Sequence, residues 1–126
     1  MTTHVATEVR FIVLGPPVPK ERPRVSGRGR TPDRTRAYER HVGICALAAR
    51  QALRETWPVD GCLYAIELRI FEAPRQRGDV DNYLKSILDG CQGVLYGNDR
   101  RIKSASVTVD VDRDTPRAEV RIGIIA

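Results

Sequence analysis

The chain has 126 residues, of which 41% are hydrophobic and 29% are charged, and its formal net charge is +5. This composition excludes a fibrous or intrinsically disordered protein, and the length predicts a single domain over residues 1–126. No apolar run approaches the roughly 18 residues that span a bilayer, and no secretory signal starts the sequence, so we expect no membrane partner and a cytoplasmic location. The three cysteines form no CxxC pair, which argues against a zinc ribbon or a thioredoxin-type site.

The first predicted element is a strand over residues 8–14, which ends at Gly15-Pro16-Pro17 because two prolines cannot continue the interior of a sheet. Residues 17–33 are rich in Pro, Gly and Arg and predict a basic loop. The stretch 20–40 holds eight basic and three acidic residues and supplies the whole net charge, since the rest of the chain is neutral. It predicts binding to a polyanion, and the alternative is a solvated loop that only aids solubility. The candidate DNA-binding residues in the loop are Lys20, Arg22, Arg24, Arg28 and Arg30.

Helices and strands are predicted to alternate after this loop. Apolar and small residues recur at three- and four-residue spacing over 34–55 and predict a helix, and apolar residues alternate over 62–71 and predict a strand. The loop 72–78 adds two candidate DNA-binding residues, Arg75 and Arg77. A second helix is predicted over 81–94, where one face carries Leu84, Ile87, Leu88, Cys91 and Leu95.

Two strands complete the predicted chain. Residues 102–111 and 118–125 are rich in β-branched side chains, and the turn over 112–116 predicts that the two segments pair as a hairpin. The order β-α-β-α-β-β therefore predicts an α+β fold in which two main helices cover a small mixed β-sheet.

Acidic residues and one lysine surround the second predicted helix. Asp79 and Asp81 are two residues apart just before it, and Asp99 lies in a turn beyond it, from which it can return to the same end. The spacing of four between Asp81, Lys85 and Asp89 places these side chains along one flank. The structural alternative is that they serve as helix caps and surface ion pairs.

The chemistry of this cluster favours a hard metal ion. Carboxylates that are brought together recruit a cation or raise a pKa. Oxygen ligands without a neighbouring histidine or cysteine favour magnesium, with manganese as the second choice. This donor set suits metal-assisted hydrolysis of a phosphodiester, in which Lys85 would stabilise the transition state or orient the attacking water.

Three blocks of sequence carry a resemblance to a known family and occur in the same order as in that family. They are GPPVPKERPR at residues 15–24, DVDNYLK at residues 79–85 with Asp89 four residues on, and GVLYGNDRRI at residues 93–102. Together they resemble the motifs of the RusA family of Holliday-junction resolvases. The blocks span most of the chain.

The resemblance implies a mixed α/β, RusA-like homodimer that cuts four-way DNA junctions by paired, symmetric nicks and uses magnesium, with no small-molecule cofactor. In the family pattern Asp79, Asp81 and Asp99 match the metal-binding carboxylates and Lys85 matches the essential lysine, so these four are the expected catalytic residues. Asp89 matches a recurrent acidic position and is expected to support them. Asn98 departs from the pattern because many members have an aspartate there, and we expect weaker metal affinity at most.

Two classes of function follow from the sequence. The first is a Mg²⁺-dependent endonuclease that resolves branched DNA in recombination and repair, and the sequence does not separate this from a nuclease with broader branched substrates. The second is a non-catalytic nucleic-acid-binding module. Replacement of Asp81 by Asn discriminates between them, because the first class predicts lost cleavage with retained binding to the junction.

Overall fold

The computed structural model describes residues 5–21 and 33–126. In chain order its elements are strand β1 (Glu8–Leu14), helix α1 (Asp33–Gln51), strand β2 (Tyr64–Glu72), helix α2 (Val80–Cys91), the short 3-10 helix η1 (Asp99–Arg101), strand β3 (Ile102–Val111) and strand β4 (Arg117–Ile124). This confirms the predicted α+β fold with its order β-α-β-α-β-β. Within the described ranges, neither helix is long and apolar enough to cross a membrane.

The four strands form one mixed sheet in the order β1-β4-β2-β3. Strand β4 is antiparallel to β1 and β2, whereas β2 and β3 are parallel. The predicted hairpin between the last two strands is therefore wrong, because β2 lies between them: Leu68 pairs with Val107 on one side and with Val120 on the other. The connection after β3 instead crosses the end of β2, where the N–H of Asp112 donates a 3.0 Å hydrogen bond to the carbonyl of Glu72.

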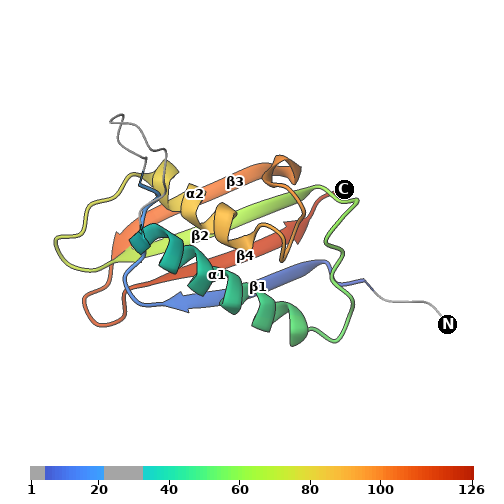
Figure 1. Cartoon of the computed structure of the whole chain (residues 1–126), viewed down its shortest axis with the longest axis horizontal. Coiled ribbons are helices and arrows are strands. Elements are labelled where there is room, and N and C mark those ends of the chain that lie inside the picture. Colours follow the sequence, from blue (N-terminus) through green and yellow to red (C-terminus); the bar gives the residue numbers. More distant parts are fainter. Residues whose placement is uncertain (1–4, 22–32) are drawn as a thin grey trace.

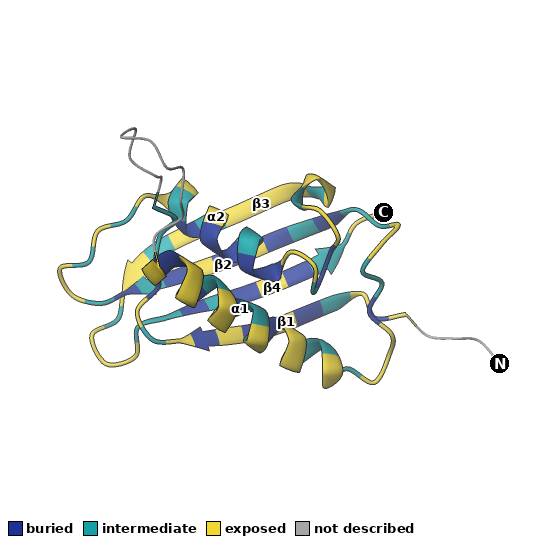
Figure 2. Ribbon diagram, in the orientation of Figure 1, coloured by how far each residue is buried: buried dark blue, intermediate teal, exposed yellow. Residues whose placement is uncertain are grey.

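Both helices lie on one face of the sheet, with α1 nearest β1 and α2 nearest β3 (Figure 1). Alternate residues of the strands point toward the helices and form the core, as the dark stripes along β1, β2 and β4 show (Figure 2). In β1 these are Val9, Phe11 and Val13. Burial of such apolar side chains contributes roughly 1.5–3 kcal/mol for each large one, which makes the sheet–helix interface the main source of stability.

The two helices approach each other closely at two glycines. A Cβ atom added to Gly90 would lie 2.7 Å from the side chain of Val42 and 2.9 Å from the carbonyl oxygen of Glu39. A Cβ atom on Gly43 would lie 3.0 Å from the carbonyl oxygen of Gly90. The missing side chains therefore let α1 pack directly against α2, which brings the acidic side chain of Glu39 to the flank of α2.

Both helices end earlier than predicted because the residues that follow them have contacts or backbone conformations that the apolar spacing does not report. Helix α1 stops at Gln51 because the following residues must return to the core, where Trp57 is buried and donates a 2.7 Å hydrogen bond to the carbonyl of Leu95. Helix α2 stops at Cys91, and Gly93 adopts a φ of 84°, a left-handed conformation that favours glycine.

Candidate functional site

The start of α2 presents two aspartates to solvent. Asp79 is the N-cap residue, in extended conformation, but its side chain makes no capping hydrogen bond. Asp79 and Asp81 are exposed and border the same depression together with Val80 and Asn82. Among residues 5–21 and 33–126, no side-chain donor competes with a ligand for either carboxylate.

A buried glutamate fixes the backbone that leads into Asp79. Glu72 is only 7% exposed, and its carboxylate accepts hydrogen bonds from the hydroxyl of Tyr83 at 2.5 Å and from the N–H of Gly78 at 2.9 Å. Gly78 lies so close to Tyr83 that a Cβ atom would be 2.5 Å from its ring. Burial, together with the hydrogen bond to Glu72, raises the pKa of Tyr83, so its hydroxyl remains a donor.

The loop between β2 and α2 is tied to the segment that follows β1. Gln76 donates from its side chain to the carbonyl of Pro17 and accepts a 3.0 Å hydrogen bond from the N–H of Ala73. The neighbouring Arg75 and Arg77 are exposed, which suits the predicted contact with phosphate. Arg77 and Asp79 also border one depression, so a basic and an acidic group lie beside each other at this end of the molecule.

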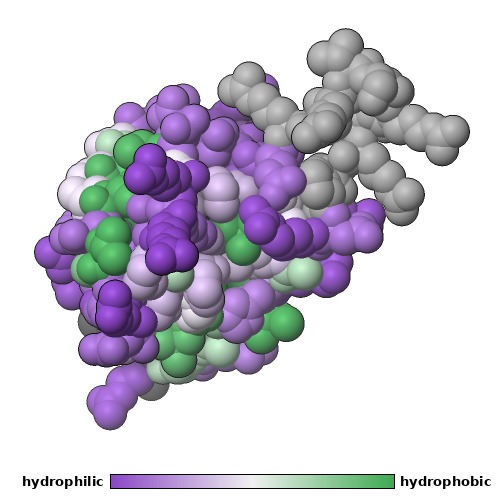
Figure 3. Space-filling view, turned by 90° about the vertical axis from the view of Figure 1, so that its left-hand side faces the viewer, coloured by the Kyte–Doolittle hydropathy of each residue, from purple (hydrophilic) through white to green (hydrophobic). Residues whose placement is uncertain are grey.

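The remaining predicted DNA-binding arginines, Arg22, Arg24, Arg28 and Arg30, lie outside the described residues. Helix α1, which follows them in the chain, begins at the same end of the molecule as α2 (Figure 1). The described surface at this end is mostly hydrophilic, with scattered hydrophobic residues (Figure 3).

Lys85 lies further along α2 and joins two carboxylates. Its ammonium group is 2.9 Å from Oδ1 of Asp89 and 3.1 Å from Oδ2 of Asp99, while its side chain remains 48% exposed. The hydrogen bond to Asp89 raises the pKa of Lys85; partial burial opposes this effect and the hydrogen bond to Asp99 reinforces it. Lys85 is therefore a cation at neutral pH and is suited to stabilising negative charge rather than to accepting a proton.

The sequence departure at Asn98 has a local structural role. Asn98 caps η1, and its side-chain oxygen accepts a 2.9 Å hydrogen bond from the N–H of Arg100. This cap holds the first residue of η1, Asp99, next to Lys85. The amide oxygen that could have served as a metal ligand is thus engaged within the chain.

The structure brings only some of the predicted residues together. Asp89 and Asp99 meet at Lys85, and Asp79 and Asp81 share a depression at the start of α2. In the described part of the chain, no three acidic, histidine or cysteine side chains are grouped closely enough to hold a metal ion. The Asp79–Asp81 pair still fits magnesium, which commonly takes one or two carboxylates and keeps several waters. The three-carboxylate set with Asp99 stays a prediction.

Lys20 occupies an unexpected place for a predicted DNA-binding residue. Its ammonium group is 3.0 Å from Oε1 of Glu39 and 3.0 Å from Oδ2 of Asp89, and its side chain is 21% exposed. Partial burial lowers the pKa of Lys20, but the hydrogen bonds to Glu39 and Asp89 outweigh this effect, so the pKa lies above its ordinary value. Lys20 therefore links α1 and α2 next to Lys85.

The sequence argument missed two acidic residues of this site, Glu39 and Glu72. Glu72 continues the alternation of Ile66, Leu68 and Ile70, so its position in the strand already predicts a side chain that faces the core. Glu39 is one of three acidic residues in the basic stretch, but only the packing of α1 on α2 shows what it contacts.

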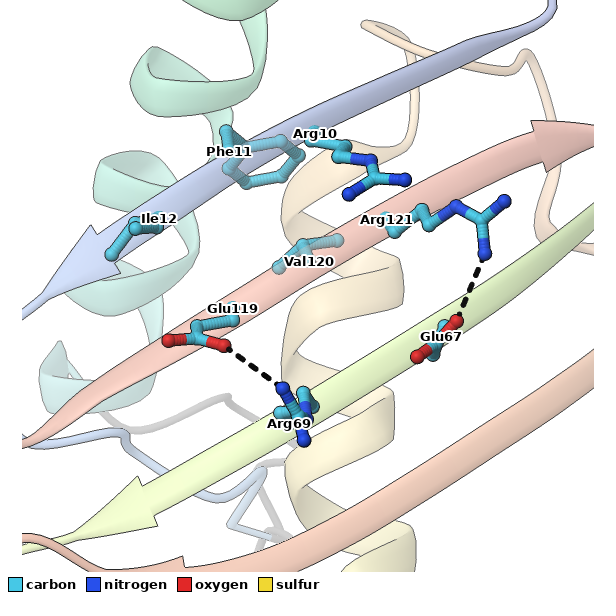
Figure 4. Close-up of a pocket in the computed structure, with 8 residues that line it drawn as sticks. All are labelled: Arg10, Phe11, Ile12, Glu67, Arg69, Glu119, Val120 and Arg121. Carbon is cyan, nitrogen blue, oxygen red and sulfur yellow. Dashed lines mark hydrogen bonds and ion pairs between the residues drawn. The ribbon is translucent and has the colours of Figure 1, made fainter.

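A second depression lies on the other face of the sheet, away from the helices (Figure 4). Its charged side chains pair within the sheet: Arg121 with Glu67 at 3.1 Å, Arg69 with Glu119 at 3.8 Å, and Arg10 with Glu8. Because these charges offset each other within the chain, this face has no excess positive charge for a phosphate backbone. The candidate site therefore lies at the start and along the flank of α2.

Comparison with known proteins supports the resemblance that the three sequence blocks show. The family model described as endodeoxyribonuclease RusA matches residues 15–123, a range that contains all three sequence blocks. The chain is also similar to the uncharacterized protein YqaN of Bacillus subtilis (strain 168), with 24% identity over an alignment that covers 90% of this chain and 94% of the relative.

Proposed function

The chain belongs to the RusA family of endodeoxyribonucleases, and from this premise we propose that it is a Mg²⁺-dependent enzyme that resolves four-way (Holliday) DNA junctions by paired phosphodiester hydrolysis in recombination and repair. The observation that carries the proposal is the exposed pair Asp79 and Asp81 at the start of α2, one helical turn before the cationic side chain of Lys85. An oxygen-only donor pair on the same helix as a fixed positive charge suits phosphoryl chemistry.

Each residue has a distinct role in this proposal. Asp79 and Asp81 would hold the ion, which would polarise the phosphate and help to activate the attacking water. Lys85, half exposed and held by Asp89 and Asp99, offsets the negative charge that develops on the phosphate in the transition state. Because Lys85 keeps its proton at neutral pH, it acts by its charge.

The substrate proposal includes a second copy of the chain. A four-way junction has two strands related by twofold symmetry, and a symmetric dimer would present one site to each of them. Arg77 borders a depression with Asp79 at the start of α2, and Arg75 is exposed in the same loop. Both would bind the phosphate backbone, together with the arginines of the basic loop. Each phosphate contact steepens the dependence of log K on log salt by about 0.9 for duplex DNA.

The test is cleavage of a synthetic four-way junction with Mg²⁺, with Mn²⁺ and with a chelator. We expect paired nicks at symmetric positions that disappear with the chelator. Asp81→Asn should slow cleavage by at least about 100-fold and leave junction binding intact. The matched control is Asp114→Asn, which changes an exposed aspartate in the turn between β3 and β4.

Other outcomes separate the alternatives. A wild-type protein that binds the junction but leaves it intact with both metal ions would support a non-catalytic nucleic-acid-binding module. Equal cutting of flaps and replication forks at the same protein concentration would indicate a broader branched-DNA nuclease. Loss of binding in Asp81→Asn would show that this aspartate is structural.

A further inference from the structure

Lys20 is fixed at both its backbone and its side chain. Its N–H donates a 2.8 Å hydrogen bond to the carbonyl of Asn82 in the first turn of α2. Its ammonium group lies between Glu39 on α1, with N–O distances of 3.0 and 3.3 Å, and Asp89 on α2, at 3.0 Å. The Lys20 side chain therefore lies between the two helices, where it contacts Asp89 near the end of α2 and Glu39 on α1.

All three charged side chains at this point are largely withdrawn from water. The exposed fractions are 21% for Lys20, 17% for Glu39 and 20% for Asp89. For Lys20 to reach a DNA phosphate, both ion pairs would have to break, and two partly buried carboxylates would lose their shared partner. Breaking a partly buried pair costs far more than breaking an exposed one, because each ion loses its partner without full access to water.

Asp89 divides its two oxygens between two lysines. Oδ2 accepts from Lys20 at 3.0 Å and Oδ1 accepts from Lys85 at 2.9 Å, and Lys85 also donates to Asp99 at 3.1 Å. Negative and positive side chains thus alternate in the order Glu39, Lys20, Asp89, Lys85 and Asp99, and each lysine lies between two carboxylates. Because Lys20 occupies Oδ2, the Asp89 carboxylate can offer Lys85 only its other oxygen.

We propose that Lys20, held by Glu39, is a positioning residue for Lys85 that acts through Asp89, and that it is not a contact to the phosphate backbone. This inference rests on the function proposed above. Without Lys20, Asp89 has both oxygens available, so Lys85 moves onto this carboxylate and away from Asp99 and from the solvent side where a phosphate would lie. The exposed Arg77, which borders the same depression as Lys20, is the contrasting phosphate contact.

The test compares Lys20→Met with Arg77→Met on a synthetic four-way junction. Binding is measured over a range of NaCl concentrations with Ca²⁺ in place of Mg²⁺, and cleavage is measured with Mg²⁺ in single turnover at saturating protein. Lys20→Met should reduce the saturating cleavage rate by about 10–100-fold, as loss of a supporting residue typically does, with unchanged affinity and salt dependence. Arg77→Met should weaken binding and reduce the log–log salt slope by about 0.9.

Two further variants keep the inference falsifiable if Lys20→Met is poorly folded. Lys20→Arg retains the charge and should recover most of the cleavage rate, whereas Glu39→Gln should reduce the rate in the same direction as Lys20→Met. A reduced salt slope in Lys20→Met with a normal saturating rate would overturn the proposal and make Lys20 a phosphate contact.

A readout that does not depend on cleavage is the side-chain ammonium resonance of Lys85 in a ¹⁵N-labelled protein at low temperature. It should shift in Lys20→Met and in Glu39→Gln but not in Arg77→Met, and an unchanged resonance would overturn the proposal. If the wild type cuts no junction, the proposed function fails, while this resonance still reports whether Lys20 positions Lys85.

Discussion

Lys85 donates a 3.1 Å hydrogen bond to Asp99, which joins the flank of α2 to the first residue of η1, the short helix that leads into β3. The contact connects two of the three sequence blocks that resemble the RusA family, although they are separated in the chain by the end of α2 and a turn. It also holds a positive charge on the flank of α2 while leaving half of the side chain exposed.

The charge of Lys85 is the first quantity to test. Lys85→Met should lower the saturating rate of junction cleavage by about 100-fold or more, because a fixed cation that stabilises developing charge typically contributes this much. Lys85→Arg should retain part of the rate, since it keeps the charge but changes the geometry. The control is Lys103→Met, which changes an exposed lysine on β3. Equal cleavage by Lys85→Met and the wild type would remove Lys85 from the mechanism.

The hydrogen bond between Tyr83 and Glu72 predicts a difference in stability between two tyrosines. Tyr83→Phe leaves the buried Glu72 carboxylate with one donor fewer and should lower the free energy of unfolding by about 1.5–3 kcal/mol. Tyr96→Phe removes a 2.6 Å hydrogen bond to the neutral carbonyl of Leu88 and should cost only about 0.5–1.5 kcal/mol. Urea unfolding of both variants measures the order, and a smaller loss in Tyr83→Phe would contradict this role of Glu72.

The sequence predicts the elements of this fold better than their pairing. Alternation in β2 and the three- and four-residue spacing in α2 are local signals, so both elements were located correctly to within a few residues. The position of β2 between β3 and β4 is a non-local property. It depends on the crossover through α2 and on a five-residue connection long enough to pass the end of β2, whereas a hairpin is the simplest local solution.

In the candidate site, too, local contacts could be predicted from the sequence and contacts between elements could not. The clustering of Asp81, Lys85 and Asp89 on one flank follows from helical spacing, and the structure confirms the pair between Lys85 and Asp89. The contacts of Lys20 could not be predicted, because they depend on the distance between α1 and α2. That distance is set by Gly90, a residue with no chemistry of its own.

Gly90 is therefore expected to be intolerant of even one methyl group. In Gly90→Ala the new Cβ atom would meet the side chain of Val42 at 2.7 Å and the backbone of Glu39 at 2.9 Å. The helices must separate, so the free energy of unfolding should fall by about 1–3 kcal/mol, despite the better helix propensity of alanine. Ala48→Gly, at an exposed position of α1, is the comparison and should cost about 1 kcal/mol through propensity alone. A stabilised Gly90→Ala would contradict the close packing.

Thiol reactivity reports the integrity of the same helix. Cys91 is fully buried at the end of α2, and burial raises the pKa of its thiol, so both access and thiolate formation are suppressed. We expect Cys91 to be alkylated at least about 100-fold more slowly than the half-buried Cys62 in the native protein, and equally fast in denaturant. Mass spectrometry of the iodoacetamide-treated protein measures both rates. Early labelling of Cys91 would show that α2 opens readily from the core.

The turn after β3 predicts a specific dependence of stability on pH. The hydrogen bond from Arg117 to Asp112, and those from the N–H groups of Thr115 and Asp114, hold the pKa of Asp112 below its ordinary value of 3.8. The folded state therefore binds this proton less readily than the unfolded state. The pair adds stability above about pH 4, and this contribution is lost as the pH falls through the lower pKa of the folded state. Asp112→Asn should accordingly lower the urea midpoint at pH 6 more than at pH 2.5, and an equal effect at both values would show that the ion pair with Arg117 adds nothing to stability.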